Sequence, residues 1–256
     1  MGRNDKIIKI LNSAFETQFE QLNNTSFKQT IIDEYKNLDE TLFLNARTDM
    51  SSSQLKKQSQ ESLKLIENDE ELVCKIDQLH NEVLKIDKKR FKEELKADLI
   101  NSFQIASEKV NENKTKHKLG ILFLEHDSDF KACFGGFGKG GYNFPIPKIP
   151  QHIEFDFPKE LFNGIGQIDY TSGLAPFLDL EKEIGEEKLD VIISELLLSE
   201  YYFQLQELFV INTYKLLHET FGELRMEKEK IGINMEKEVF VFGNEHDCGA
   251  RCIYLF

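Results

Sequence analysis

The chain has 256 residues, of which 40% are hydrophobic and 30% are charged, and its formal net charge at pH 7 is −13. This composition is typical of a folded globular protein with one large core or two modest ones. The charge is uneven, with −2 over residues 1–117 and −11 over residues 118–256. An acidic surface repels phosphate backbones and attracts basic proteins, so the charge argues against nucleic acid as a ligand.

The sequence also indicates a compartment. No apolar run approaches the roughly 20 residues that a membrane-spanning helix needs, and the first residues lack the apolar stretch of a signal peptide. The four cysteines are sparse and unevenly spaced, which favours reduced thiols. We therefore expect a cytoplasmic protein that does not bind membranes.

The first part of the chain has helical periodicity. Apolar residues recur every three or four positions over residues 4–22 and again from Phe27 to Leu42, as on one face of a helix. A heptad seam then runs through Leu72, Ile76, Leu79, Val83 and Ile86, but it covers only about two heptads, which favours packing within a bundle over a coiled coil. We predict a helical region over residues 1–85.

A second part, residues 86–256, is predicted to form an α+β domain. An amphipathic helix with apolar positions from Phe91 to Val110 precedes the apolar run Ile121–Leu124, a polar turn at 125–129 and a second run at 130–134. A similar order of strand, turn and strand recurs over residues 238–256. These two hairpins are predicted to belong to one antiparallel sheet, packed against one or two long helices.

The segment between the hairpins is mixed. Five glycines lie between Gly135 and Gly141, which predicts a flexible loop, and alternating residues over 152–157 predict a half-exposed strand. Residues 163–176 are predicted to be an irregular loop because they contain several glycines and a proline. Residues 186–223 are predicted to be mostly helical and largely buried.

Several motifs resemble catalytic or metal-binding signatures without completing them. Gly136–Gly141 matches G-x-G-x-x-G, but the prolines that follow prevent the helix that a dinucleotide site requires, so no cofactor is expected. The paired C-x2-C spacing of structural zinc sites is missing. If a metal is bound, its candidate ligands are His126, His246, Cys248 and Cys252.

The tripeptide Glu-His-Asp occurs twice, at 125–127 and at 245–247, each time directly after a predicted strand. If the two turns are neighbours, their carboxylates form a cluster that can bind cations or take part in acid–base chemistry. Solvated turn residues are the simpler interpretation. The candidate binding residues are Glu125, His126, Asp127, Asp129, Glu245, His246 and Asp247.

The order of elements from Phe91 to Phe256 resembles bacterial cytosolic domains that accompany polymorphic toxins, some of which act as immunity proteins. The residues that carry this resemblance are the strand and acidic turn LGILFLEHDSD, the helical region YYFQLQELFVINTYKLLHETFGEL and the final strand and turn EVFVFGNEHDC. The resemblance implies binding without catalysis, through an acidic face that covers a toxin.

The sequence therefore favours a non-enzymatic cytosolic binding protein, immunity-like in outline, that uses its acidic surface to bind a protein partner, with a basic partner favoured by the charge. Two alternatives remain open. One is a metal-dependent or Cys/His hydrolase built on the two Glu-His-Asp turns. The other is a helical adaptor that self-associates through the seam at Leu72–Ile86. The sequence gives no oligomeric state.

Overall fold

The structure is a computed structural model. It describes residues 2–24, 51, 53–54, 57, 60, 64, 68, 70–112, 117–127, 129–139, 152–153, 159–184, 200–227, 230–245 and 250–256. The chain divides into two compact units. The first contains Met1–Phe19, Ile86–Gly173 and Ile211–Phe256, and the second contains Glu20–Lys85 and Leu174–Val210. The predicted boundary between residues 85 and 86 is one place where the chain changes unit, but each unit takes in segments from both sides of it.

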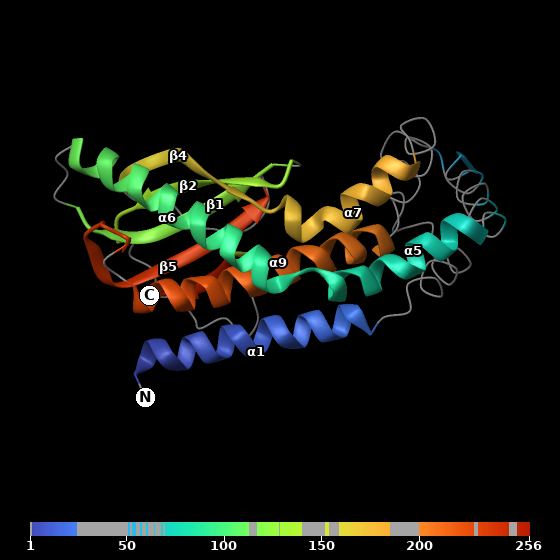
Figure 1. Ribbon diagram of the computed structural model, residues 1–256, viewed down its shortest axis with the longest axis horizontal. Helices are drawn as coiled ribbons and strands as arrows, with labels where there is room; N and C mark the ends of the chain where they lie inside the picture. Colours follow the sequence, from blue (N-terminus) through green and yellow to red (C-terminus); the bar gives the residue numbers. More distant parts are fainter. Residues whose placement is uncertain are drawn as a thin grey trace. The chain divides into compact units, whose positions relative to one another are not determined.

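The first unit contains a six-stranded sheet with the order β3-β6-β5-β1-β2-β4 (Figure 1). The strands are β1 (Leu119–His126), β2 (Lys131–Phe137), β3 (His152–Ile153), β4 (Glu160–Asp169), β5 (Met235–Glu245) and β6 (Ala250–Leu255). Both predicted hairpins are confirmed, because β1 pairs antiparallel with β2 and β5 pairs antiparallel with β6. The hairpins meet, however, through a parallel pairing of β1 with β5, so the sheet is mixed and not purely antiparallel.

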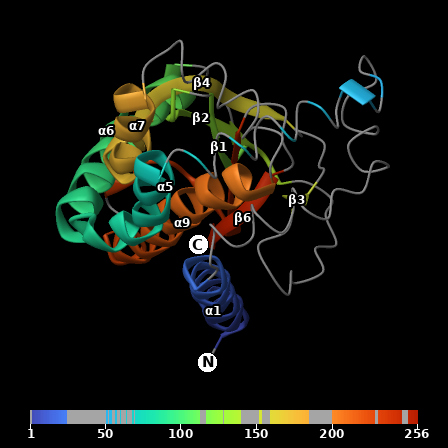
Figure 2. The ribbon, with the colours of Figure 1, turned by 90° about the vertical axis from the view of Figure 1, so that its right-hand side faces the viewer.

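The described helices are α1 (Arg3–Asn23), α5 (Glu70–Glu82), α6 (Lys88–Glu112), α7 (Thr171–Ile184) and α9 (Glu200–Met226), with a short 3-10 helix η1 (Val83–Lys85). Figures 1 and 2 show α6 and the second half of α9 on the same side of the sheet. The fold class is therefore α+β, with a mainly antiparallel sheet packed against long helices, as the sequence predicts.

Helix α6 shows how the sequence directs this packing. Its N-terminus is capped by Asp87, whose Oδ1 accepts a hydrogen bond from the Arg90 N–H at 3.1 Å. Its predicted apolar face is buried at Phe91, Leu95, Leu99, Phe103 and Ala106. The Phe103 ring meets Phe134 of β2 edge-on, with centroids 5.1 Å apart. Each buried leucine or phenylalanine of this face stabilises the fold by about 1.5–3 kcal/mol, so this face holds α6 on the sheet.

Helix α1 contributes residues 3–19 to the first unit, with Ile7, Leu11, Phe15 and Phe19 buried along one face. Polar contacts fix its two ends. Near its start the Asn4 side chain donates to the Phe256 carbonyl at 3.1 Å, and the Asp5 carboxylate lies 3.3 Å from the Arg225 guanidinium. Farther along, Glu16 pairs with Lys215 of α9 at 3.7 Å. The two ends of the chain therefore lie close together.

The prediction of an irregular loop over residues 163–176 is wrong, because this segment belongs to β4 and α7. Two of its glycines contributed to the prediction of a loop. Gly164 and Gly166 have positive φ angles of 60° and 67°, which glycine adopts without strain inside an irregular edge strand. A Cβ on Gly166 would lie 2.3 Å from the Ser102 hydroxyl oxygen of α6, so glycine also permits close packing of helix on strand. Pro176 lies within α7 despite its missing N–H.

The predicted glycine loop over 135–141 is also partly wrong. Gly135 and Gly136 belong to β2, and a Cβ on Gly136 would lie 2.1 Å from the Phe162 ring, which occupies that space. Gly138 also stays close to β4, because its N–H donates to the Lys159 carbonyl at 3.0 Å. Residues 140–150 lie outside the described part of the chain.

Other predicted elements are described only in part. The strand predicted over 152–157 begins as β3, and the helix predicted over 186–223 is present from Glu200 onward as α9. The remaining residues of both, and the helix predicted from Phe27 to Leu42, lie outside the described residues. None of the described helices combines the length and the apolar character that crossing a membrane requires.

The described part of the second unit is helical. Its helical parts include residues 20–23 of α1, α5, η1, residues 174–184 of α7 and residues 200–210 of α9. The Phe177 and Phe209 rings contact each other there with centroids 6.0 Å apart. Leu79 and Val83 of the heptad seam are buried within this chain, which leaves them no exposed surface for self-association.

Candidate functional site

The parallel pairing of β1 with β5 brings the first Glu-His-Asp tripeptide next to Glu245, the first residue of the second. His126, the last residue of β1, is the register partner of Glu245, the last residue of β5, and Glu125 pairs with Asn244. The two parallel strands therefore end side by side at the same edge of the sheet. His246, Asp247 and Cys248 lie outside the described residues.

Three exposed carboxylates, Asp127, Asp129 and Glu245, stand at this edge, and we call them the acidic rim. Within the described part of the chain, none of the three forms an ion pair with a lysine, arginine or histidine. The turn that carries the first two is well ordered by local bonds. The Phe130 N–H donates to the Asp127 carbonyl at 2.9 Å, and Asp129 Oδ1 accepts from the Lys131 N–H at 3.1 Å. These bonds hold the Asp127 backbone and the Asp129 carboxylate in place.

Glu125 does not belong to the rim. It is half-buried and is the register partner of Cys133 of β2. Neighbouring residues of a strand alternate between the two faces of a sheet, so Glu125 and His126 point to opposite faces. The sequence predicted one cluster of charged side chains, and the sheet distributes it over two faces and the edge.

His126 lies beneath the rim with only 3% of its surface exposed. Its Nδ1 lies 3.1 Å from the Asp127 carbonyl oxygen, which only accepts hydrogen bonds, so Nδ1 carries the proton. Its Nε2 is consequently an acceptor in the neutral ring and faces the Tyr214 hydroxyl of α9 at 3.5 Å. Phe130 and Tyr170 contact the ring with centroid distances of 5.7 and 5.5 Å.

Two opposing influences act on the proton affinity of His126. Burial, the larger one, lowers the pKa of His126 below its ordinary value because the charged ring loses its hydration. The hydrogen bond to the Asp127 carbonyl and the negative charges of Glu245, Asp127 and Asp129 raise that pKa in opposition. The site therefore places a histidine that is neutral at physiological pH next to charges that favour its protonation.

Tyr170 completes the buried side of the site. Its hydroxyl has no hydrogen-bond partner among the described residues, although the side chain is only 2% exposed. Burial raises the pKa of Tyr170 well above its ordinary value, and the neighbouring Tyr214 and Cys133 add to this effect. Tyr170 is therefore a neutral group that shields His126 from solvent.

Cys252 and His126, two of the candidate metal ligands, do not lie beside each other. Cys252 is the register partner of Phe242, three residues before Glu245 on β5, which places it about 10 Å along the strand from the level of His126. Burial raises the pKa of Cys252 to about 12, and burial together with the Glu125 charge raises the pKa of Cys133. Both thiols are thus protonated at neutral pH. Among the described residues, no three His, Cys, Asp or Glu side chains come together as metal ligands.

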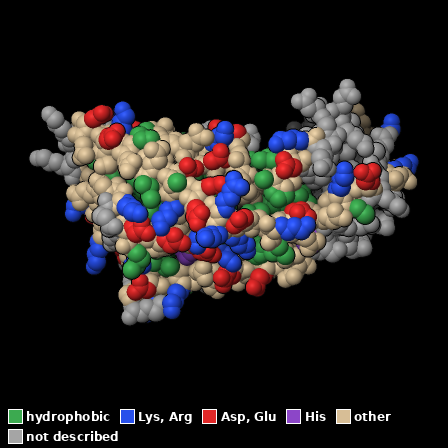
Figure 3. Space-filling model, viewed as in Figure 1, with side chains coloured by type: hydrophobic (Ala, Val, Ile, Leu, Met, Phe, Trp, Pro, Cys, Tyr) green, Lys and Arg blue, Asp and Glu red, His purple; other side chains and the backbone are tan. Residues whose placement is uncertain are grey.

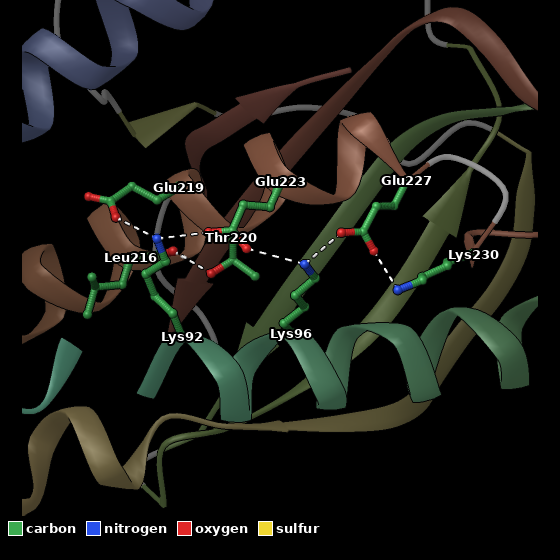
Figure 4. A network of polar contacts seen from close by, with 8 residues as sticks. All are labelled: Lys92, Lys96, Leu216, Glu219, Thr220, Glu223, Glu227 and Lys230. Carbon is green, nitrogen blue, oxygen red and sulfur yellow. Dashed lines mark hydrogen bonds and ion pairs between the residues drawn. The ribbon is translucent and has the colours of Figure 1, made fainter. Parts of the chain in front are cut away.

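A second group of carboxylates lies between α6 and α9. Glu219 and Glu223 of α9 and Glu227, which directly follows that helix, are spaced four residues apart, and Lys92 and Lys96 of α6 alternate with them; we call this group the ion-pair ladder (Figure 4). Lys92 Nζ lies 3.1 Å from Glu219 and 3.0 Å from Glu223. Lys96 Nζ lies 3.3 Å from Glu223 and 2.9 Å from Glu227. Figure 3 shows acidic and basic side chains interspersed on this face of the molecule.

The charges of the ladder stabilise one another. The hydrogen bond from Lys92, followed by that from Lys96, lowers the pKa of Glu223 despite its partial burial. Hydrogen bonds from Lys230 and Lys96 lower the pKa of Glu227 to about 2. This network was not predicted from the sequence. Its lysines are spaced four residues apart, and so are its glutamates, which is the spacing of neighbours on one side of a helix. No such spacing links His126 to Tyr170 and Tyr214, so that group was not accessible from sequence.

Comparisons of this chain with protein-family models, with curated proteins and with solved structures find no match. The interpretation of the site therefore depends on its own geometry and charge.

Proposed function

We propose that this protein is a non-enzymatic binding protein that uses the acidic rim to engage a basic protein partner. The observation that carries this proposal is the contrast in charge pairing within the first unit. The glutamates of the ladder are paired with lysines of the same chain, whereas Asp127, Asp129 and Glu245 have no ion-pair partner among the described residues.

Unpaired charges of one sign that are gathered at one edge attract an oppositely charged surface and speed its encounter. The rim is well suited to this role because strands hold it. Glu245 ends a strand of 11 residues, and the turn at Asp127–Asp129 joins two paired strands. A partner therefore meets charges that need little further ordering, which lowers the entropic cost of binding.

The state of the thiols is a poor match for the hydrolase alternative. A cysteine nucleophile reacts as the thiolate, and an activated site lowers the pKa of its thiol. Here burial raises the pKa of both Cys133 and Cys252. An immunity-type role, which the resemblance to domains that accompany polymorphic toxins implies, is the more specific form of our proposal, in which the basic partner is a toxin.

The test uses the full chain as bait for proteins from its own cells. A rim variant carries Asp127→Asn, Asp129→Asn and Glu245→Gln, which removes three charges but keeps the acceptor that Asp129 offers to the Lys131 N–H. A matched control carries Glu93→Gln, Glu108→Gln and Glu160→Gln, three exposed carboxylates elsewhere in the first unit.

We expect the wild-type chain and the control to retain the same basic protein, and the rim variant to bind it about 10-fold or more weakly at low salt. Purified partner and a titration of salt give the affinities directly, and the difference should shrink as salt is added. If the rim variant and the control bind the partner equally well, or if no protein is retained specifically, the proposal is wrong.

A further inference from the structure

Strand β4, at the outer edge of the sheet (Figure 1), contains a dipeptide whose chemistry is separate from the acidic rim. Asn163–Gly164 is the one Asn-Gly pair of the sequence, and both residues are exposed. We propose that Asn163 is a modification site, which deamidates spontaneously in the folded protein through a succinimide closed by the Gly164 backbone nitrogen. This inference does not depend on the proposed function.

The reaction needs no reagent other than water. The Gly164 backbone nitrogen loses its proton to solvent and forms a bond to the Asn163 Cγ, while the side-chain amide nitrogen takes up a proton and leaves as ammonia. Water then opens the cyclic imide. Opening at the side-chain carbonyl gives aspartate, and opening at the main-chain carbonyl gives isoaspartate, in which the main chain runs through the former side chain. One water is consumed and one ammonia is released, and nothing is oxidised or reduced.

The dipeptide lies in a bulge of the strand. Between Phe162 and Ile165, β4 advances by three residues while its partner β2 advances by two, so β4 has one residue more than the ladder needs. Asn163 and Gly164 fill this interval, and neither is a register partner of a β2 residue. The Gly164 nitrogen is therefore not tied into the regular pairing of the sheet, and its reaction leaves the registered pairs on both sides in place.

The two groups that react are already next to each other. The Gly164 N–H donates to the Oδ1 of Asn163 at 2.9 Å. The Asn163 Cγ is bonded to that oxygen, so it lies no more than about 4.1 Å from the attacking nitrogen. Gly135 of β2 makes room for this arrangement, because a Cβ there would lie 3.1 Å from the same Oδ1. Holding two reacting groups together in this way removes much of the entropic barrier to their reaction.

The approach to the Asn163 Cγ is open on the side of Gly164. Gly164 has a φ of 60°, which glycine adopts without strain, and a Cβ placed on it would meet no described atom within 4 Å. Solvent therefore reaches the nitrogen and can take its proton. Glycine also presents no side chain to hinder closure of the ring.

Two other asparagines of the first unit show the opposite arrangement. Asn12 and Asn101 are each followed by a serine, another small residue, but they lie inside α1 and α6. In a helix interior the next N–H is bonded to the carbonyl four residues before it. The nitrogen reacts only after local opening of the helix, which costs free energy. The fold therefore protects these two asparagines and leaves Asn163 reactive.

The test compares the folded full chain with the same chain unfolded in guanidinium chloride at equal pH. Samples are digested at intervals, and mass spectrometry measures deamidation at Asn12, Asn101 and Asn163, with fragmentation that distinguishes isoaspartate from aspartate. The ratio of folded to unfolded rate at each site removes the effect of local sequence. We expect this ratio at Asn163 to exceed those at Asn12 and Asn101 by about 10-fold or more. Equal protection at all three sites, or a product at Asn163 without isoaspartate, would overturn the inference.

Variants then assign the reacting atoms. Gly164→Ala adds a Cβ beside the attacking nitrogen, and we expect it to slow deamidation of Asn163 by about 10-fold or more. Asn163→Gln keeps an amide but requires a larger ring, so the mass change in this peptide should disappear even if Gly164→Ala does not fold. The matched control Asn101→Gln, on the exposed side of α6, should leave the rate at Asn163 unchanged. Persistence of the mass change at the wild-type rate in Asn163→Gln would place the reaction at another residue and refute the proposal.

Discussion

The first unit contains two groups of three carboxylates, and the groups differ in whether lysines of the chain pair with them. Glu219, Glu223 and Glu227 lie along α9 and just past its end and are paired with lysines of the same unit. The rim carboxylates are equally numerous and lie at the end of the sheet, where the described residues provide no ion-pair partner. The difference teaches that the charge of this protein has two uses: the ladder supports the fold, and the rim remains available to another molecule.

The backbone explains why the two groups differ. Residues four apart lie on one side of a helix, so Lys92 and Lys96 of α6 can interleave with glutamates four apart on α9. At the rim, the parallel strands β1 and β5 end together, which places Glu245 beside the residues that follow β1. The pairing of β1 with β5, which apolar residues direct, thus brings negative charges together. The packing of α6 on α9 instead places glutamates beside lysines.

The largest effect on stability is expected from removing the lysines of the ladder. Lys92→Met with Lys96→Met keeps the apolar stems, whose side chains are 25% and 24% exposed, but leaves three glutamates in a row without these partners. We expect the free energy of unfolding in urea to fall by about 2 kcal/mol, because four partly exposed pairs are lost and the glutamates repel one another.

The matched control for this variant is Lys89→Met with Lys109→Met, two exposed lysines on the same helix. Its free energy of unfolding should stay within about 0.5 kcal/mol of the wild-type value, as is usual for surface substitutions. Equal losses in both double variants would show that the ladder is no more important to the fold than any other surface charge.

The loss of unfolding free energy in the Lys92→Met, Lys96→Met variant should depend on pH. The lowered pKa values of Glu223 and Glu227, the latter about 2, mean that the ladder stabilises the fold fully above the unfolded pKa of about 4.3 and loses this effect as pH falls toward about 2. Despite the opposing effect of burial on Lys92, the hydrogen bonds that both lysines donate to the glutamates raise the pKa of each lysine, so their contribution is lost only as pH rises past about 10.4.

The difference in unfolding free energy between the wild-type chain and the Lys92→Met, Lys96→Met variant should therefore be flat between pH about 5 and about 9 and should shrink on either side. The lowered pKa values of His126 and His218 reduce the stability of both proteins as pH falls below about 6.5, and this effect cancels in the difference. A difference that changes most near neutral pH would contradict the assignment to the ladder.

Much of this architecture follows from patterns in the sequence, and the exceptions have physical causes. Apolar periodicity correctly locates α6, and runs of β-branched and aromatic residues locate the two hairpins. Gly164, Gly166 and Pro176 obscure β4 and α7 in the sequence, although Gly166 is needed for a close approach to Ser102 and Pro176 lies within α7. Local propensity cannot show the close approach, since it depends on α6 and β4 lying side by side.

The candidate site was predictable in its residues but not in its arrangement. The repeated Glu-His-Asp tripeptide identifies the rim, yet only the register of β1 with β5 shows that the two copies meet. The alternation of strand residues then separates Glu125 from His126, and the packing of α9 brings Tyr214 to the buried ring. Sequence reasoning finds which groups are charged, whereas long-range pairing decides which of them share a site.

The smallest effect is expected at the rim itself, and it tests the comparison most directly. Neutralising Asp127, Asp129 and Glu245 with Asn, Asn and Gln relieves repulsion among like charges and breaks no described ion pair. The unfolding free energy should therefore be unchanged or rise by about 0.5 kcal/mol in low salt, and the difference should vanish in high salt. A loss of about 1 kcal/mol or more, measured by the same urea titration, would mean that the rim supports the fold as the ladder does. A stable variant that no longer binds basic ligands would instead show that these carboxylates are kept for a partner, because a charge that contributes nothing to stability needs another reason to be gathered at one edge.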